Sequence, residues 1–236
     1  FRSLRRRLRW CLRMIDLILL AAGSSRRFRA SGSGSKLLTL WNGRPMYRTS
    51  LERWEEASRG MLDGGRVYVV SREPEILEAA AEYGMVPVFS PESAQGISWS
   101  IRNGLCAAGS QTAARTGRQA DHYVFAVTDQ PMLTAGTMRR FLQQAQTSVY
   151  ACLSWDGRTG NPVSFPAEAV EELMMLEGDS GGKKVLRRHM EECTMVSAAE
   201  AVELKDIDTL EQLREAERES VSSGKQTADG FPPGKI

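Results

Sequence analysis

The residues best suited to chemistry follow a short apolar run near the start of the chain. The run, Ile15 to Ala22, contains one acid and ends at Gly23, two serines and two arginines, with Lys36 further along. A buried strand that ends at glycine and small polar residues leaves several backbone N–H groups pointing into one concavity, which can bind an anion. Arginine and lysine would add positive charge, so the stretch predicts phosphate binding. The alternative is an ordinary strand-to-loop turn with solvated arginines.

A second chemical signal stands at the end of another apolar strand. The run His122 to Val127 leads to Asp129, and Pro131 prevents the strand from continuing. Ligands of open α/β sheets gather at the carboxyl ends of the strands, and Mg²⁺ binds one or two carboxylates together with phosphate and water. Asp129 is therefore predicted to bind magnesium opposite the anion loop, the alternative being that it caps the next turn. Asp208 is either a second carboxylate for the metal or only a residue ahead of a capped helix.

A third polar segment, Gln95 to Leu105, begins with residues suited to a turn and a helix start. Gly96 favours a tight turn, and Ser98 favours the N-cap of a helix that runs towards Ala108. The hydroxyls and amides at such a helix start could hold a polar ligand. An ordinary capped helix explains the same residues equally well.

The elements that must position these residues alternate between strands and helices. Strands are predicted at 15–22, 67–70, 86–89, 122–127, 149–155, 161–165, 194–196 and 202–204, with a short extended piece at 37–41. Helices are predicted at 45–57, 74–83, 98–108, 134–146, 167–176, 181–189 and 209–219, and residues 109–119 are predicted to form a mobile surface loop. The repeated β-α-β order predicts a Rossmann-like α/β fold of three layers. Its twisted sheet is mostly parallel, and residues 149–165 add an antiparallel hairpin.

Composition favours one globular domain. The chain has 236 residues, of which 42% are hydrophobic and 25% charged, which is enough for a substantial core. We expect a domain over 14–219, a basic extension over 1–13 and a disordered tail rich in glycine, serine and proline over 220–236. A basic amphipathic helix that binds an acidic surface is the alternative for the extension.

The charge distribution and the cysteines exclude several classes of function. Residues 1–13 carry six arginines and no acid, so the formal net charge of +2 becomes −4 without them, which argues against nucleic acid as a partner. No apolar run approaches the roughly 20 residues of a membrane helix, and none is typical of a signal peptide. Four scattered cysteines and two unpaired histidines disfavour structural zinc, a disulfide scaffold and a cysteine–histidine nucleophile. They fit buried thiols in the cytoplasm.

Six motifs taken together resemble a known enzyme family. Leu20–Phe28 with Lys36 resembles the L-A-A-G-x-S-x-R-M/F signature of nucleotidyltransferases. The later motifs follow the order seen in the molybdenum cofactor cytidylyltransferases, and they are Gln95–Ser100, Thr128–Pro131, Gly160–Val163, Gly178–Gly182 and Asp206–Thr209. The likeness covers about residues 14–219. It departs from the family at Arg29, where a glycine is usual, and in the long glycine- and serine-rich stretch before Lys36.

The resemblance implies transfer of CMP from CTP to the terminal phosphate of molybdopterin, with release of pyrophosphate and with Mg²⁺ as cofactor. It implies catalytic roles for Arg27, Lys36 and Asp129, and metal ligation by Asp129 and Asp208. The nucleotide and the acceptor would be bordered by Leu20, Ala21, Ala22, Gly23, Ser24, Ser25, Gly96, Ser98, Ser100, Gly160 and Asn161, with Gly181 and Gly182 on the acceptor side. A molybdoenzyme or its maturation factor would be the partner that receives the product.

The identity of the nucleotide depends on one methyl group. Ala22 stands where relatives that transfer GMP tend to carry a second glycine, and this resembles the group that transfers CMP. One methyl group discriminates by only about 1–3 kcal/mol through steric contact. CTP is therefore expected, with GTP as the alternative.

Three other functions could use the same residues. A sugar phosphate or an isoprenoid-alcohol phosphate could replace molybdopterin as the acceptor, and a nucleotide-sensing module could keep the anion site without turnover. An NAD-binding Rossmann domain is disfavoured, because Gly-x-Gly-x-x-Gly is absent after the first strand. In addition, Ser71 and Arg72 rather than an acid follow the second strand.

Overall fold

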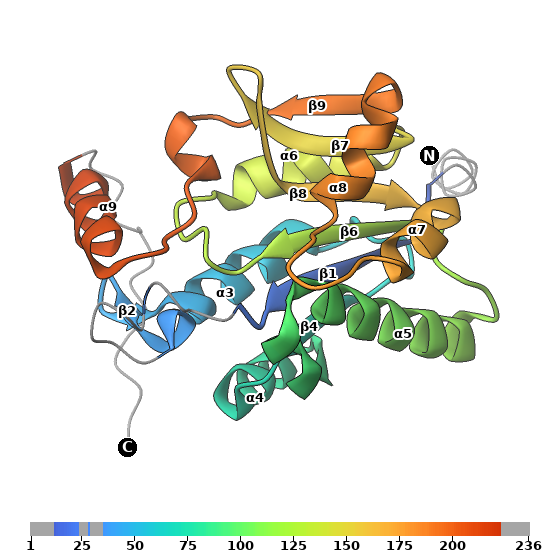
Figure 1. Ribbon diagram of the computed structural model, residues 1–236, viewed down its shortest axis with the longest axis horizontal. Helices are drawn as coiled ribbons and strands as arrows, with labels where there is room; N and C mark the ends of the chain where they lie inside the picture. The colour runs from blue at the N-terminus through green and yellow to red at the C-terminus, as the bar shows by residue number, and fades with distance from the viewer. Residues whose placement is uncertain (1–11, 24–27, 29–34, 223–236) are drawn as a thin grey trace, which may run out of the picture.

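The computed structural model describes residues 12–23, 28 and 35–222. Its centre is a seven-stranded sheet with the spatial order β5-β4-β1-β6-β8-β7-β9 (Figure 1). In chain order the strands are β1 Ile15–Ala21, β4 Val67–Ser71, β5 Val86–Phe89, β6 His122–Val127, β7 Tyr150–Trp155, β8 Arg158–Pro166 and β9 Cys193–Ser197. Strand β8 is antiparallel to its neighbours β6 and β7, and the other neighbouring pairs are parallel. The predicted, mostly parallel sheet with an antiparallel hairpin is confirmed.

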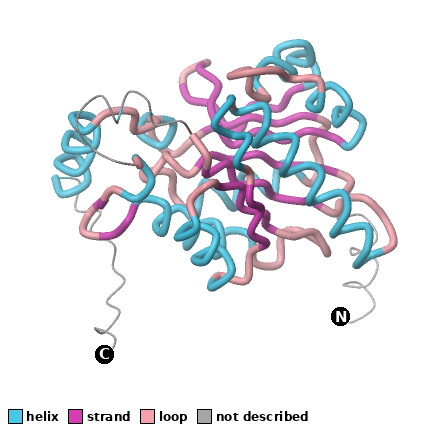
Figure 2. The backbone as a smooth tube through the Cα atoms, turned by 60° about the horizontal axis from the view of Figure 1, so that its bottom comes forward, coloured by secondary structure: helices cyan, strands magenta, loops and turns pink. Residues whose placement is uncertain are grey.

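Helices cover both faces of the sheet, which gives the three predicted layers (Figure 2). One face packs against α3 Met46–Ser58, α4 Pro74–Glu82 and α6 Ala135–Ala145, and the other against α5 Ile97–Thr116, α7 Val170–Met174 and α8 Lys183–Leu186. Successive side chains of a strand point to opposite faces, so Leu17 and Leu19 enter the first core and Ile18 enters the second. Burial on both faces explains why the central strands are continuous apolar runs.

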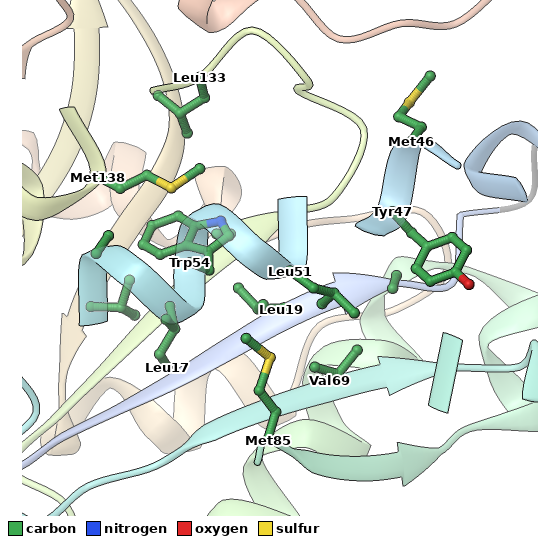
Figure 3. Close-up of a cluster of buried hydrophobic side chains, with 14 of the residues drawn as sticks. Leu17, Leu19, Met46, Tyr47, Leu51, Trp54, Val69, Met85, Leu133 and Met138 are labelled. Carbon is green, nitrogen blue, oxygen red and sulfur yellow. The ribbon is translucent and has the colours of Figure 1, made fainter. Parts of the chain in front are cut away.

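The first core anchors α3 on β1 (Figure 3). Leu51 and Trp54 of α3 lie fully buried with Leu17 and Leu19 of β1, and Met138 of α6 belongs to the same cluster. Full burial of one such side chain stabilises the fold by about 1.5–3 kcal/mol. Helix α3 is therefore a rigid support for the loops that it contacts.

The loop predicted at 109–119 is wrong for most of its length. Residues 109–116 continue α5, which ends at Gly117 in the left-handed conformation, with φ of 75°. Thr112 is buried in this part of the helix and donates a hydrogen bond to Asp16 in β1. Packing on the sheet thus overrides the weak helix propensity of the glycine, serine and threonine residues in the segment.

Several short elements also differ from the prediction. The strand predicted at 202–204 is a 3₁₀ turn, η6 Ala201–Leu204, and the piece predicted as extended at 37–41 starts with another, η2 Lys36–Leu38. The helix predicted at 181–189 is α8 followed by η5 Arg187–Glu192, because His189 has non-helical backbone angles. The remaining elements are the hairpin of β2 Leu40–Trp41 and β3 Arg44–Pro45, the 3₁₀ turns η3 Pro91–Gln95 and η4 Ala167–Ala169, and α9 Leu210–Ser222, which lies beside β2 (Figure 1).

The topology places the carboxyl ends of β1 and β6 side by side. Leu20 of β1 pairs with Val127 of β6, so the two strands end at the same level. From β1 the chain passes outward through β4 to β5, and it returns to the other side of β1 as β6. Ligands of open α/β sheets bind where the strand order reverses in this way.

Candidate active site

A cavity of about 410 Å³ lies at this reversal point, within the range of small-molecule sites. Gly23 and Asp129, which the sequence predicts to face one ligand, both border it. The full lining is Leu20, Ala22, Gly23, Phe28, Lys36, Leu37, Ser93, Gly96, Ile97, Ser100, Val127, Thr128, Asp129, Asp179 and Asp208.

Lys36 lies between two carboxylates in this cavity. Its Nζ is 2.6 Å from Asp129 Oδ2 and 3.1 Å from Asp208 Oδ1. The Lys36 side chain is only 8% exposed, whereas those of Asp129 and Asp208 are 23% and 32% exposed. Asp129 Oδ1 is buried and has no hydrogen-bond partner among the described residues. Lys36 therefore bridges the two carboxylates inside the cavity.

The charges around the cluster act on its titrating groups. Burial lowers the pKa of Lys36, but the charges and hydrogen bonds of Asp129 and Asp208 outweigh burial and raise that pKa above its usual value. Lys36 is therefore a cation at neutral pH. Desolvation of its carboxyl group, followed by the charge of Asp129, raises the pKa of the neighbouring Asp206 to about 6.

Hydrogen bonds from α3 fix the loop that carries Asp129. Ser50 Oγ donates to the carbonyl of Thr128, the residue before Asp129, at 3.0 Å. The Arg53 guanidinium donates to the carbonyls of Pro131 and Leu133. Because α3 is anchored in the core, this carboxylate is held from behind by a rigid helix.

A second set of contacts brings Asp208 to the same place. The Ile207 N–H donates to the Asp129 carbonyl at 3.0 Å, which ties the two acidic segments together. Upstream, the Glu203 carboxylate is only 2% exposed and accepts hydrogen bonds from hydroxyls in the first turn of α6, which fixes η6. The Asp208 N–H itself donates to Gln212 Oε1 at 2.7 Å.

Gly96 forms the opposite wall through a close backbone contact. Its φ of 138° favours glycine, and a Cβ there would lie 2.2 Å from the Gly178 carbonyl oxygen. The same oxygen accepts a hydrogen bond from the Ser98 N–H at 3.1 Å. The start of α5 is therefore joined to the 177–182 loop, and Asp179 of that loop borders the cavity.

The sequence matches the model of the MobA-like NTP transferase domain over residues 17–193, which is most of the chain. The chain belongs to the MobA-like NTP transferase family. It is therefore a nucleotidyltransferase, and the NAD-binding alternative is excluded. A comparison with curated protein sequences finds no match.

Solved structures share the fold of this transferase. A nucleotidyl transferase from Methanothermobacter thermautotrophicus has a TM-score of 0.71 and 21% identity, with 89% of this chain and 99% of that chain covered. Rv0371c from Mycobacterium tuberculosis H37Rv, in complex with manganese, has a TM-score of 0.65 and 21% identity, with 87% and 98% covered. A CMP:2-keto-3-deoxy-manno-octonic acid synthetase in complex with CTP has a TM-score of 0.58 and 13% identity, with 89% and 99% covered.

The transferase brings eight of the predicted site residues together in the cavity. Those that line the cavity are Leu20, Ala22, Gly23, Lys36, Gly96, Ser100, Asp129 and Asp208. Ser24, Ser25 and Arg27 lie outside the described residues.

The other predicted site residues lie beyond this lining. Ala21 and Ser98 are buried, and the Ser98 hydroxyl has no hydrogen-bond partner among the described residues. Gly160 and Asn161 are in β8, where Gly160 allows the close approach of Leu204. Their roles in binding stay predictions.

Sequence reasoning missed some of the residues that line the cavity. Asp179 lies inside a motif that was recognised, but only the glycines of that motif were assigned to the site. Ser93 precedes the recognised Gln95–Ser100 motif and accepts a hydrogen bond from the Ser100 hydroxyl at 2.7 Å. Assigning every polar residue of the Gly178–Gly182 motif to the site would have found Asp179, and extending the Gln95–Ser100 motif towards the N-terminus would have found Ser93.

The residues present fit a divalent cation. Asp129 Oδ1 is a buried oxygen that has no hydrogen-bond partner in the described part of the chain, and the Lys36 ammonium already lies as a cation between the two carboxylates. Among the described residues, no three histidine, cysteine or acidic side chains are grouped to hold a metal. Two carboxylates with phosphate oxygens suit Mg²⁺, which retains water and substrate oxygens in its shell.

In the described part of the chain, no helix has the length and apolarity needed to cross a bilayer.

Proposed function

We propose that this transferase moves CMP from CTP to the terminal phosphate of molybdopterin and releases pyrophosphate. The observation that carries the proposal is the cluster of Lys36, Asp129 and Asp208 in one cavity with the Gly23 backbone. A glycine turn and a cation can hold phosphates, and two carboxylates can hold the metal that accompanies them. The acceptor comes from the resemblance of the six sequence motifs to the molybdenum cofactor cytidylyltransferases.

Phosphate binding is the task of the first-strand loop and Lys36. The backbone at Ala22 and Gly23 and the ammonium of Lys36 would hold the β- and γ-phosphates and stabilise the departing pyrophosphate. Arg27 is proposed for the same role. Transfer of this kind requires mainly positioning and charge neutralisation, so a rigid site of fixed charges is sufficient.

Mg²⁺ is the proposed cofactor. Held by Asp129 and Asp208, it would draw negative charge from the α-phosphate. The neighbour Rv0371c has a manganese complex, which supports a divalent cation in this fold.

The chemical step requires no general base. A terminal phosphate oxygen of the acceptor attacks the α-phosphorus, and the bond from that phosphorus to the bridging oxygen of pyrophosphate breaks. The attacking oxygen is already anionic, so no proton has to be removed. Neither histidine borders the cavity, which agrees with this mechanism.

The choice of CTP depends on the Ala22 side chain, which lines the cavity where the GMP-transferring relatives tend to have a second glycine. The CTP complex of one structural neighbour is consistent with this base. The product would pass to a molybdoenzyme or its maturation factor.

The experiment is a pyrophosphate-release assay with each of the four ribonucleotides, Mg²⁺ and one candidate acceptor at a time. The acceptors are reduced molybdenum cofactor, a sugar phosphate and an isoprenoid-alcohol phosphate. Pyrophosphate release that occurs with CTP and the molybdenum cofactor, and with no other pair of substrates, supports the proposal. Faster release with GTP would overturn the base assignment, and release with another acceptor would overturn the acceptor. Nucleotide binding without any release would favour a sensor.

A further inference from the structure

The position of Lys36 raises a question that the reaction scheme leaves open. Its ammonium lies within 2.6 and 3.1 Å of the two carboxylate oxygens that a metal would need. A divalent cation and this ammonium cannot occupy the same space between Asp129 and Asp208, and their charges repel each other at short range.

Burial makes this arrangement a specific one. The Lys36 side chain is 8% exposed, whereas a lysine side chain is usually solvated. Two carboxylates that face one another without a cation between them would repel each other in a partly desolvated site. Lys36 therefore stabilises the carboxylate pair in the ligand-free protein.

The same cavity offers the lysine a second partner. The backbone of Ala22 and Gly23 borders the space that Lys36 also borders, so phosphates held there lie within the same cavity as the ammonium. Lysine carries a compact charge on a flexible stem, which suits a movement between two anionic partners better than the planar fork of arginine.

Resting on the proposed function, we propose that Lys36 is an internal cation that blocks the metal site until the nucleotide arrives. In the free protein Lys36 bridges Asp129 and Asp208, and it leaves Asp129 Oδ1 without a hydrogen-bond partner among residues 12–23, 28 and 35–222. The triphosphate attracts the ammonium away from the carboxylates, and this opens them to the divalent cation. Metal and nucleotide therefore enter together, because each favours the same position of Lys36.

The test measures Mn²⁺ binding by electron paramagnetic resonance on the full chain without nucleotide. Lys36→Met keeps the length of the side chain and removes its charge, and we expect at least about tenfold tighter Mn²⁺ binding than in the wild type. Lys205→Met is the matched control, because Lys205 pairs with the exposed Glu219 away from the cavity and its loss should change nothing. Adding Asp129→Asn to Lys36→Met should remove the gain.

Equal or weaker Mn²⁺ binding by a folded Lys36→Met protein overturns the proposal. If that variant does not fold, the lysine side-chain NMR signals of the wild type are followed instead, with Lys36→Arg to assign the Lys36 signal. Metal-free tripolyphosphate should shift that signal, and a signal unchanged at saturation overturns the proposal. Neither experiment requires turnover, so a failure of the CTP reaction would remain distinguishable from a failure of this inference.

Discussion

Two aspartates at opposite ends of the neighbouring strands β1 and β6 have contrasting surroundings. Asp16, near the amino end of β1, is fully buried and accepts hydrogen bonds from the Arg66 N–H at 2.9 Å on Oδ1 and from Thr112 Oγ1, which is 2.8 Å from Oδ2 and 3.0 Å from Oδ1. Asp129, beyond the carboxyl end of β6, keeps Oδ1 without a partner among the described residues. The protein itself satisfies the first carboxylate, whereas the second is left for a ligand.

The contrast extends to the neighbours of each carboxylate. Thr112 Oγ1 donates to Asp16 and accepts from the Tyr68 hydroxyl at 2.9 Å, so a chain of neutral donors stabilises the buried charge. Even so, burial raises the pKa of Asp16 above its usual value. The carboxylate at the other end has Lys36 as its partner, a cation that we propose is exchanged for a metal ion. Buried charge alone therefore does not identify a functional site, whereas at Asp129 an incomplete set of partners coincides with a cavity.

The largest expected effect tests Asp129, the carboxylate with an incomplete set of partners among the described residues. Asp129→Asn should lower the rate of pyrophosphate release at least about a thousandfold, because it removes about 4 kcal/mol of stabilisation that metal ligation gives to the transition state. Nucleotide binding, measured by isothermal titration, should persist in part. The matched aspartate variant, Asp16→Ala, should keep the wild-type rate per folded molecule. An Asp129→Asn protein that retains a tenth of the activity would break the comparison.

The next effect tests Asp16, the carboxylate that the protein itself satisfies, through the free energy of unfolding. Asp16→Ala should lower the free energy of unfolding by about 3 kcal/mol, because it leaves the buried Thr112 hydroxyl and the part-buried Arg66 N–H without their acceptor. Urea unfolding followed by circular dichroism measures the change. A loss below about 1 kcal/mol would show that water replaces the carboxylate, and that Asp16 is less enclosed than its burial indicates.

The sequence was sufficient to predict the fold because its central strands are continuous apolar runs separated by helices. It did not predict the second half of α5, because the buried Thr112 there has its hydrogen-bond partner, Asp16, far away in the sequence. Local propensity carries no record of such a contact. The misassigned turn η6 has the same origin, because it depends on the buried Glu203 and its bonds to α6.

The candidate site could be predicted as a set of residues but not as an arrangement. Lys36, Asp129 and Asp208 could be singled out because each belongs to a recognisable motif. Nothing in their spacing predicts that the lysine bridges both acids, because that contact depends on how α3 and η6 position two distant loops. The presence of Asp179 in the cavity likewise depends on the contact of Gly96 with the loop that carries it.

A pH effect should belong to the amino end of the sheet. Burial, followed by the charge of Arg13, lowers the pKa of His122 from 6.5 to about 4. Between these values the unfolded chain binds a proton that the folded protein does not, so stability falls as the pH falls. From pH 7 to pH 5 this histidine should account for a loss of about 2 kcal/mol.

The measurement is urea unfolding of the wild type and His122→Gln at both pH values. The carboxylates contribute equally to the two proteins, so the difference between their pH dependences isolates the histidine. Identical pH dependences would mean that His122 is protonated in the folded state. Burial would then not lower the pKa of His122 at the amino end of β6.

The smallest expected effect lies one step further from the Asp16 carboxylate. Tyr68→Phe removes the hydroxyl that donates to Thr112 Oγ1 and should lower the free energy of unfolding by about 1 kcal/mol, the usual net value of one neutral hydrogen bond. Thr112→Val should lower it more, because it removes the direct partner of the charge. If Tyr68→Phe were as costly as Thr112→Val in urea unfolding, the tyrosine would act on the carboxylate as strongly as its direct partner. The amino end would then be one coupled network rather than a graded series of donors.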